Sequence, residues 1–208
     1  MQTRIRAVLY DFDGVIQDSM AEEYKGCVAV FKAAGLEPPS LSCFCQKLTM
    51  PFSEWFKSYG VNMPWDELQL IYHAHVNKRL PPLFPGVVET MIRLKEARIK
   101  QGVVSASGWI TLRDNLARHD LIKYLDVALG ESENKTRAII QACKDMDVPV
   151  EQTLYVGDLT SDIRDGKLAG VLTAAFIGPN GDSKVFNEVR PDFKVLSHNA
   201  LACMILGF

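Results

Sequence analysis

The sequence predicts an α/β fold, in which a Rossmann-like core with a parallel sheet carries an inserted helical cap domain. From residue 84 onward, short apolar runs alternate with amphipathic helical patterns, which is typical of a parallel sheet with helices on both faces. Helical patterns without strands interrupt this alternation from about 18 to 80. A simple crossover usually carries one helix, so this stretch is interpreted as a separate domain. The predicted domains are 1–16 with 84–208 for the core and 17–83 for the cap.

Each strand is predicted at an apolar run, and several runs are apolar almost throughout, as expected of strands buried on both faces. The predicted strands are 6–10, 100–105, 126–129, 153–157, 171–177 and 193–195. Helices are predicted where apolar residues recur every three or four positions. In the core they are 87–97, 111–118, 135–146 and 161–169, and in the cap 19–34, a looser 41–48, 52–59 and 66–80.

Size and composition are those of an ordinary globular protein. The chain has 208 residues, of which 48% are hydrophobic and 23% charged, so one large domain or a core with a small insert is expected. The net charge of −2 and a pI near 6.1 do not indicate a nucleic acid or an anionic membrane as partner. No apolar run is long enough to cross a bilayer. Residues 1–6 lead directly into a strand, so no signal peptide is expected.

The cysteines and histidines do not predict a disulfide framework or a zinc site. The five cysteines are odd in number and scattered, which favours reduced thiols and a cytoplasmic protein. Cys43 and Cys45 lack a second pair at a suitable spacing. His73 and His75 are two residues apart and would lie on different faces of a helix.

Two aspartates directly after the first strand form the most informative motif. Asp11 and Asp13 follow the apolar run, and Gly14 indicates that the chain turns there. Ligands of open α/β sheets bind outside the carboxyl ends of the strands. Aspartate is rarely fully buried unless it is paired or binds a metal. The alternative is an ordinary strand end with turn-forming aspartates.

Other chemically active side chains are expected at the same edge of the sheet. Ser105 follows the second strand, Asp158 follows the fourth, and Lys135 opens a helix. Each has a plain alternative, because Ser105 or the neighbouring Ser107 could cap the next helix, Asp158 could cap the helix after it, and Lys135 could be solvated. Asp162, four residues after Asp158, would be mildly destabilising as a like-charge neighbour on a surface helix. A bound cation would explain why both acids are present.

The set as a whole predicts a site for a phosphate group and a magnesium ion. Mg²⁺ prefers hard oxygen ligands and commonly binds next to a phosphate. Helix N-termini behind Ser105 and Asp158 would favour an anion. Without a cation, clustered carboxylates would repel an anionic substrate.

These residues give the sequence a resemblance to the haloacid dehalogenase superfamily, in particular to members similar to phosphoglycolate phosphatase and β-phosphoglucomutase. The resemblance covers essentially the whole chain. Four motifs match in order: Asp11-Phe-Asp-Gly-Val, Val103-Val-Ser-Ala-Ser-Gly, Lys135, and Val156-Gly-Asp-Leu-Thr-Ser-Asp162. The helical insert is similar to the family's small α-helical cap, and Phe84-Pro-Gly-Val is similar to its return hinge.

The resemblance implies a two-step phosphoryl transfer. Asp11 would attack phosphorus and form an aspartyl-phosphate. Asp13 would protonate the leaving oxygen and then deprotonate the attacking water. Mg²⁺ would be held by Asp11, the backbone carbonyl of Asp13 and Asp158, with Asp162 supporting that shell.

The resemblance also implies how the substrate is held. Ser105, with Ala106 beside it, and Lys135 would bind phosphate oxygens, and Lys135 would also offset the charge of Asp11. The cap would close over the substrate, and Lys47 is a candidate contact for a second anionic group. Trp55, on the other side of the break at Pro51, is expected to have a packing role. Two positions depart from the frequent pattern: Ala106 stands where asparagine is frequent, and Thr136 where proline often follows the lysine.

The predicted function is that of a Mg²⁺-dependent phosphatase acting on a small phosphorylated metabolite, as a monomer or homodimer. A sugar phosphomutase is the enzymatic alternative. Such mutases often carry an acid directly before the aspartate of the fourth motif, whereas this chain has Gly157. Dehalogenases usually lack an acid equivalent to Asp13. A binding or regulatory protein without turnover is the non-enzymatic alternative, and the full set of acids argues against it.

Overall fold

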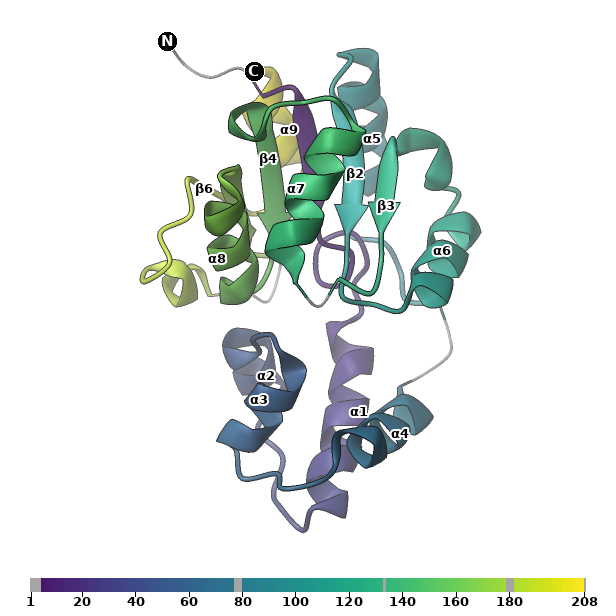
Figure 1. Ribbon diagram of the computed structural model, residues 1–208, viewed down its shortest axis with the longest axis vertical. Helices are drawn as coiled ribbons and strands as arrows, with labels where there is room; N and C mark the ends of the chain where they lie inside the picture. The colour runs from purple at the N-terminus through teal and green to yellow at the C-terminus, as the bar shows by residue number, and fades with distance from the viewer. Residues whose placement is uncertain (1–4, 77–79, 133, 179–181, 208) are drawn as a thin grey trace. The chain divides into compact units, whose positions relative to one another are not determined.

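The chain folds into two compact units, shown in Figure 1. The computed structural model describes residues 5–76, 80–132, 134–178 and 182–207. Unit 1 consists of Met1–Gln17 and Leu83–Phe208, and unit 2 of Asp18–Pro82. Each unit has its own hydrophobic core.

Unit 1 is built on one parallel sheet. Its strands are β1 (Ala7–Tyr10), β2 (Lys100–Val104), β3 (Val127–Leu129), β4 (Thr153–Gly157), β5 (Leu172–Phe176) and β6 (Phe193–Val195). Among the described residues they lie in the order β3-β2-β1-β4-β5-β6, and all neighbouring pairs are parallel. The predicted α/β fold with a parallel sheet is confirmed. Because the order reverses at β1, the carboxyl ends of β1 and β4 lie next to each other at the position where such sheets bind ligands.

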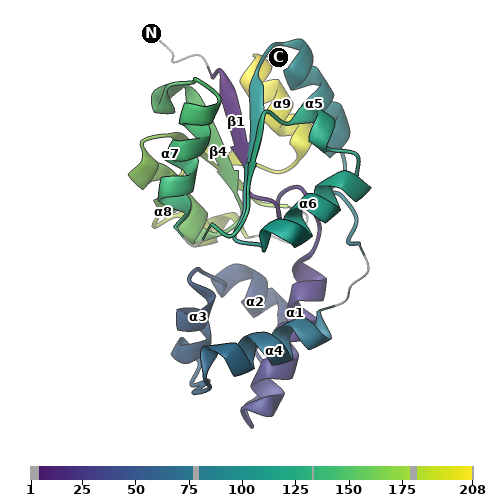
Figure 2. The same cartoon turned by 45° about the vertical axis from the view of Figure 1, so that its right-hand side comes forward.

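Helices cover both faces of the sheet (Figures 1 and 2). The α-helices of unit 1 are α5 (Val87–Glu96), α6 (Trp109–Arg118), α7 (Lys135–Asp145), α8 (Thr160–Ala169) and α9 (His198–Leu206). Short 3-10 turns are η1 (Ile122–Tyr124), η2 (Val150–Gln152) and η3 (Ser183–Phe186). Helix α5 packs against α9, and α7 packs against α8 on the opposite face. No described helix has the length and apolar character needed to cross a membrane.

The side chains of β1 point alternately to the two faces of the sheet, and they pack in two separate hydrophobic clusters. Val8 and Tyr10 pack in the cluster that includes α5 and α9, whereas Ala7 and Leu9 pack in the cluster that includes α7. All four side chains are fully buried, which explains why the run carries no polar residue before Asp11.

Unit 2 consists of helices in its described part: α1 (Met20–Ala33), α2 (Leu41–Lys47), α3 (Phe52–Ser58) and α4 (Trp65–His75). Its core is largely aromatic, with Phe31, Phe44 and Trp55 buried together. The predicted helix over 66–80 is too long. Helix α4 ends at His75 because Val76 is extended, and residues 77–79 lie outside the described residues.

His198 links α9 to the loop after β1. Its side chain is buried, and its Nε2 lies 2.8 Å from the carbonyl oxygen of Val15. A carbonyl oxygen accepts only, so Nε2 carries the hydrogen. Burial lowers the pKa of His198, although its hydrogen bond with Val15 acts in the opposite direction.

Acidification is therefore expected to destabilise the fold through His198. As the pH falls below the ordinary histidine pKa of about 6.5, the unfolded chain takes up a proton before the folded chain does, so stability is lost. Urea unfolding at about pH 7.5 and about pH 5.5 measures this loss across the histidine titration. The His198→Gln variant keeps an amide donor but does not titrate, and it should lose less stability than the wild type. An equal loss in both proteins would contradict the prediction.

Candidate active site

Asp11 lies at the carboxyl end of β1, directly beside β4. Its backbone N–H donates to the carbonyl of Val156 at 2.8 Å, which continues the pairing of the two strands. Its Oδ1 accepts a hydrogen bond from the N–H of Phe12 at 2.8 Å. Only 5% of the residue is exposed. A buried carboxylate requires a charged or hydrogen-bonding partner, and a lysine provides it.

Lys135 is the first residue of α7, and it is buried rather than solvated. Its Nζ donates to Asp11 Oδ2 and to Asp162 Oδ1, each at 2.7 Å. The helix is capped by Asn134, whose side chain accepts from the N–H of Arg137. The cap therefore starts the helix at a position where the lysine side chain reaches the two acids, and the solvated alternative for Lys135 is wrong.

Two further acids follow β4 and complete a cluster. Asp162 is fully buried, and its Oδ2 accepts from the N–H of Leu159 at 2.9 Å. Leu159 is the N-cap residue of α8, so the interpretation of Asp158 as a helix cap is wrong. Carboxylate oxygens of Asp11, Asp158 and Asp162 all lie within 4.8 Å of one another.

The cluster combines three carboxyl groups with one ammonium group, and their burial shifts the pKa values of several of them. Burial raises the pKa of Asp11 to about 7, although the charge of Lys135 opposes this shift. Burial also raises the pKa of Asp158 well above its usual range, and the charge of Asp162 adds to the shift. Burial alone would lower the pKa of Lys135, but Asp11 and Asp162 more than offset this and raise it well above its usual value. Lys135 is therefore positively charged at neutral pH.

The donor set fits a divalent cation. When all three carboxyl groups are ionised they outnumber the one lysine, which contacts Asp11 and Asp162 only, and a divalent ion would offset the excess negative charge. All the candidate ligands are hard oxygens, which suits Mg²⁺ or Ca²⁺ rather than zinc. Asp162 already accepts hydrogen bonds from Lys135, Leu159 and Tyr155, so it is better suited to supporting Asp11 and Asp158 than to replacing them.

The loop after β2 brings two serines to the same edge. Ser105 is buried, and its Oγ accepts from the N–H of Ser107 at 3.0 Å. The Oγ of Ser107 donates to Asp13 Oδ2 at 2.6 Å. Gly108 is the N-cap residue of α6, so the interpretation of either serine as a helix cap is wrong. Ala106 lies between them and is partly exposed. Ser107 is a site residue that the sequence had indicated only as a possible cap.

The candidate residues of unit 2 lie in and after α2. Lys47 is exposed at the end of that helix. Trp55, considered with it, is buried among aromatic rings, and its Nε1 has no hydrogen-bond partner among the described residues. The packing role expected for Trp55 is confirmed.

Residues 8–176 match the family of haloacid dehalogenase-like hydrolases. The chain belongs to this family. The resemblance drawn from the four motifs is thus confirmed.

Individual relatives of the hydrolase are similar over almost their entire length. A glyceraldehyde 3-phosphate phosphatase of Methanopyrus kandleri is 27% identical over 92% of this chain and 93% of its own. A putative pyrophosphatase PpaX of Caldanaerobacter subterraneus is 26% identical over 91% and 90%. The crystal structure of a predicted phosphatase from Clostridium acetobutylicum shares the fold with a TM-score of 0.84, at 16% identity over 99% and 100% of the chains.

Two glycines let the backbone of the hydrolase pass close to the acids. Gly14 has a φ of +77°, and a Cβ at this position would lie 2.1 Å from Asp158 Oδ2. A Cβ at Gly157 would lie 2.2 Å from the Cβ of Asp162. Neither position accepts a side chain unless an acid moves.

Gly14→Ala is expected to displace Asp158 and to weaken Mg²⁺ binding by about tenfold or more, the range found when a group that positions a metal ligand is lost. Gly35→Ala is the matched control. Gly35 has a similar φ of +71° and no atom near its missing Cβ, so both variants carry the backbone strain of about 1–2 kcal/mol. Calorimetric titration should therefore give a lower affinity for Mg²⁺ in Gly14→Ala than in Gly35→Ala. Equal affinity in both variants would contradict the geometry.

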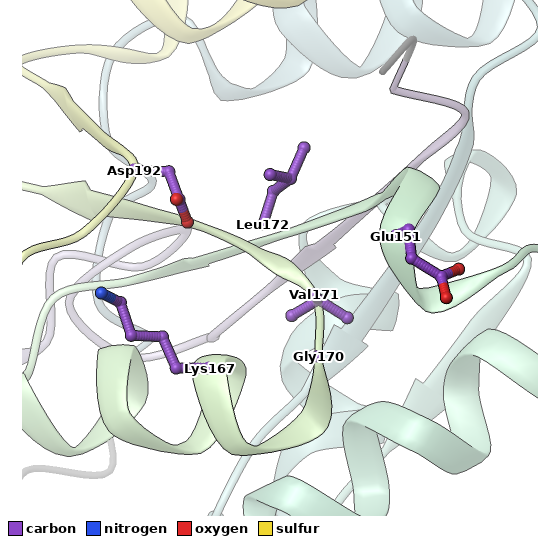
Figure 3. A pocket seen from close by; sticks show the side chains of 6 residues that line it. All are labelled: Glu151, Lys167, Gly170, Val171, Leu172 and Asp192. Atoms are coloured by element: carbon purple, nitrogen blue, oxygen red, sulfur yellow. The ribbon is translucent and has the colours of Figure 1, made fainter. Parts of the chain in front are cut away.

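A hollow of about 360 Å³ lies at the opposite edge of the sheet in the hydrolase (Figure 3). It is lined by Glu151, Lys167, Gly170, Val171, Leu172 and Asp192. Its charged groups serve the fold, since Lys167 donates to the carbonyl of Arg190 and Asp192 accepts from the N–H and hydroxyl of Thr173. The acidic cluster is therefore the better candidate for catalysis.

Proposed function

We propose that this protein is a Mg²⁺-dependent phosphatase that hydrolyses a small phosphorylated metabolite through an aspartyl-phosphate intermediate. The observation that carries the proposal is the buried pair of Asp11 and Lys135 at the carboxyl end of β1, with Asp13 two residues further on. The two relatives named above are a phosphatase and a putative pyrophosphatase, and each is similar over nine-tenths of this chain.

Asp11 is the proposed nucleophile. One of its carboxylate oxygens attacks phosphorus, the bond from phosphorus to the ester oxygen breaks, and an acyl phosphate forms on Asp11. The hydrogen bonds from Lys135 and from the N–H of Phe12 hold the carboxylate in one orientation. A held nucleophile avoids part of the entropic cost of reaching the transition state.

Asp13 is the proposed general acid and base. It gives a proton to the departing oxygen in the first step, and it takes a proton from the attacking water in the second. The water attacks phosphorus, which releases phosphate and restores the Asp11 carboxylate. Asp13 is partly exposed whereas Asp11 is buried, so the residue that must exchange protons is the more accessible one.

The transferred phosphoryl group requires positive charge and hydrogen-bond donors. Lys135 keeps its charge at neutral pH because of the two acids beside it. The Oγ of Ser105 already accepts a hydrogen bond from Ser107, so its own hydrogen can be donated to a phosphate oxygen. Ala106 is proposed to contact the same group through its backbone. Donors of this kind stabilise the charge that develops on phosphoryl oxygens.

Asp11, Asp158 and the backbone carbonyl of Asp13 are proposed to hold Mg²⁺, with Asp162 supporting them. When bound, the ion neutralises charge on the carboxylates and on the phosphoryl oxygens. The cluster of three acids, two of which contact Lys135, supports this assignment.

The position before Asp158 favours a phosphatase over a phosphomutase. An acidic residue is frequent there in the sugar phosphomutases that resemble this chain. A Cβ at Gly157 would collide with Asp162, so this site does not accept an acid without rearrangement. A non-catalytic binding protein would have no need of a second acid at position 13.

Unit 2 is proposed to act as the cap and to set the preference among phosphate esters. Lys47 is exposed there and is the proposed contact for a second anionic group of the substrate. A substrate with a carboxylate or a second phosphate would use such a contact.

Release of inorganic phosphate tests the proposal. The panel contains an aryl phosphate, glyceraldehyde 3-phosphate, 2-phosphoglycolate, a sugar phosphate and pyrophosphate, each with Mg²⁺ and with EDTA. We expect turnover of phosphate monoesters that EDTA abolishes and Mg²⁺ restores. No turnover of any compound would reject the enzyme, and turnover unaffected by EDTA would reject the metal.

A further inference from the structure

Ser107 joins the loop after β2 to the proposed general acid and base. Its Oγ donates to Asp13 Oδ2 at 2.6 Å, although the two residues are 94 positions apart in the chain. This is a short hydrogen bond from a neutral hydroxyl to a carboxylate. Hydrogen bonds with one ionised partner are stronger than those between two neutral groups. The hydroxyl has no capping function, because Gly108 is the N-cap residue of α6.

The backbone of Ser107 is held on both sides of its Cα. Its N–H donates to Ser105 Oγ at 3.0 Å, and its carbonyl accepts from the N–H of Glu131 at 2.8 Å. A Cβ at Gly130 would lie 3.0 Å from that same carbonyl oxygen, so the loop after β3 approaches Ser107 closely. The hydroxyl is therefore presented to Asp13 from a well-anchored loop.

A bond of this kind controls the orientation of the carboxyl group. When one carboxylate oxygen is held, rotation of the group is restricted, and the direction of the other oxygen is set as well. A hydroxyl both donates and accepts, so it can remain bonded to Asp13 in either protonation state. Asp13 passes through both states in the proposed reaction.

We propose that Ser107 is a positioning residue that orients Asp13 for proton transfer to the leaving group. The proposal rests on the proposed phosphatase function. It predicts a property that a merely structural role would lack. Poor leaving groups, such as alkoxides, depend on a proton from the general acid, whereas good leaving groups, such as nitrophenolates, depart without it.

The test compares kcat/KM for alkyl phosphates and for aryl phosphates of increasing leaving-group acidity. This constant covers the steps up to departure of the leaving group, so it reports on the acid role of Asp13 alone. Ser107→Ala should lower kcat/KM for both substrate classes, and the loss for alkyl phosphates should exceed the loss for nitrophenyl phosphate by about tenfold or more. This excess is a part of the roughly 10²–10⁴-fold acceleration that a general acid contributes. Asp13→Asn should show the same selectivity with a larger loss.

A matched pair of variants makes the result specific. Ser107→Thr and Ser107→Val have the same shape and differ in the hydroxyl, so the threonine variant should keep the alkyl phosphate activity that the valine variant loses, even if the alanine variant folds poorly. Equal losses for both classes, or equal behaviour of threonine and valine, would overturn the role of Ser107. Absence of turnover in the wild type would instead overturn the phosphatase function.

Discussion

Replacement of Asp11 by asparagine is expected to lower turnover by at least about 10³-fold, because loss of a nucleophile commonly costs this much or more. Asparagine has the same size, but its amide does not attack phosphorus to give an acyl phosphate. The fold should be retained. An amide oxygen can still accept the hydrogen bond from Lys135, and Lys135 also keeps its bond to Asp162.

Phosphate release and urea unfolding should be measured on the same Asp11→Asn preparation. Asp114→Asn is the matched control, since Asp114 is an exposed acid on α6 whose contact with Arg118 is also exposed. This control should keep both activity and stability. Turnover close to the wild-type rate in Asp11→Asn would reject Asp11 as the nucleophile.

Replacement of Lys135 by methionine should reduce both stability and activity. The lysine is buried between two carboxylates, and removal of one partner from a buried ion pair costs about 3–5 kcal/mol. Turnover should also fall about 10²–10³-fold, as it does when a group that stabilises transition-state charge is removed. Methionine fills a similar volume without charge, so packing is largely kept.

Mg²⁺ gives this variant a diagnostic behaviour. Without the lysine, the acids carry more uncompensated charge, so the ion should stabilise Lys135→Met more than it stabilises the wild type. Urea unfolding with and without Mg²⁺ measures the difference. Lys144→Met, at an exposed lysine of the same helix, should behave as the wild type. A stable and active Lys135→Met variant would contradict the assigned role.

The central strands β1 and β4 could be predicted closely because they are buried on both faces. A strand without an exposed face contains almost no polar residue, so its bounds show in the sequence as the ends of an apolar run. The predicted bounds of β4 and β6 agree with the structure, and the other strands differ by one or two residues. The position of the site could be predicted for the same reason, since polar residues directly after such runs mark the carboxyl edge of the sheet.

Helix α9 was not predicted, although the sequence holds a signal for it. Its residues are mostly apolar, so they lack the alternation of an amphipathic helix. Its ends are nevertheless marked. The side chain of Ser197 accepts from the N–H of Ala200 at the start, and Gly207 is left-handed at the end with a φ of +79°. A search for caps instead of periodicity would have found it.

The pairing of side chains within the site could not be predicted from the sequence. The position of Lys135 as the first residue of a helix is compatible with a solvated side chain, and only the approach of β1 and α8 to α7 buries it. The bond between Ser107 and Asp13 likewise depends on how the loops after β1 and β2 meet. Such contacts are set by tertiary packing, which local patterns do not encode.

Trapping of the phosphorylated enzyme would show whether Asp11 carries the phosphoryl group during turnover. Wild-type protein is mixed with a ³²P-labelled phosphate monoester that it turns over, quenched in acid within the first turnover, and digested. We expect label on the peptide that contains Asp11, released by hydroxylamine as expected of an acyl phosphate, and no label in the Asp11→Asn variant. Turnover without such a labelled peptide, or label on a different residue, would contradict the proposed mechanism.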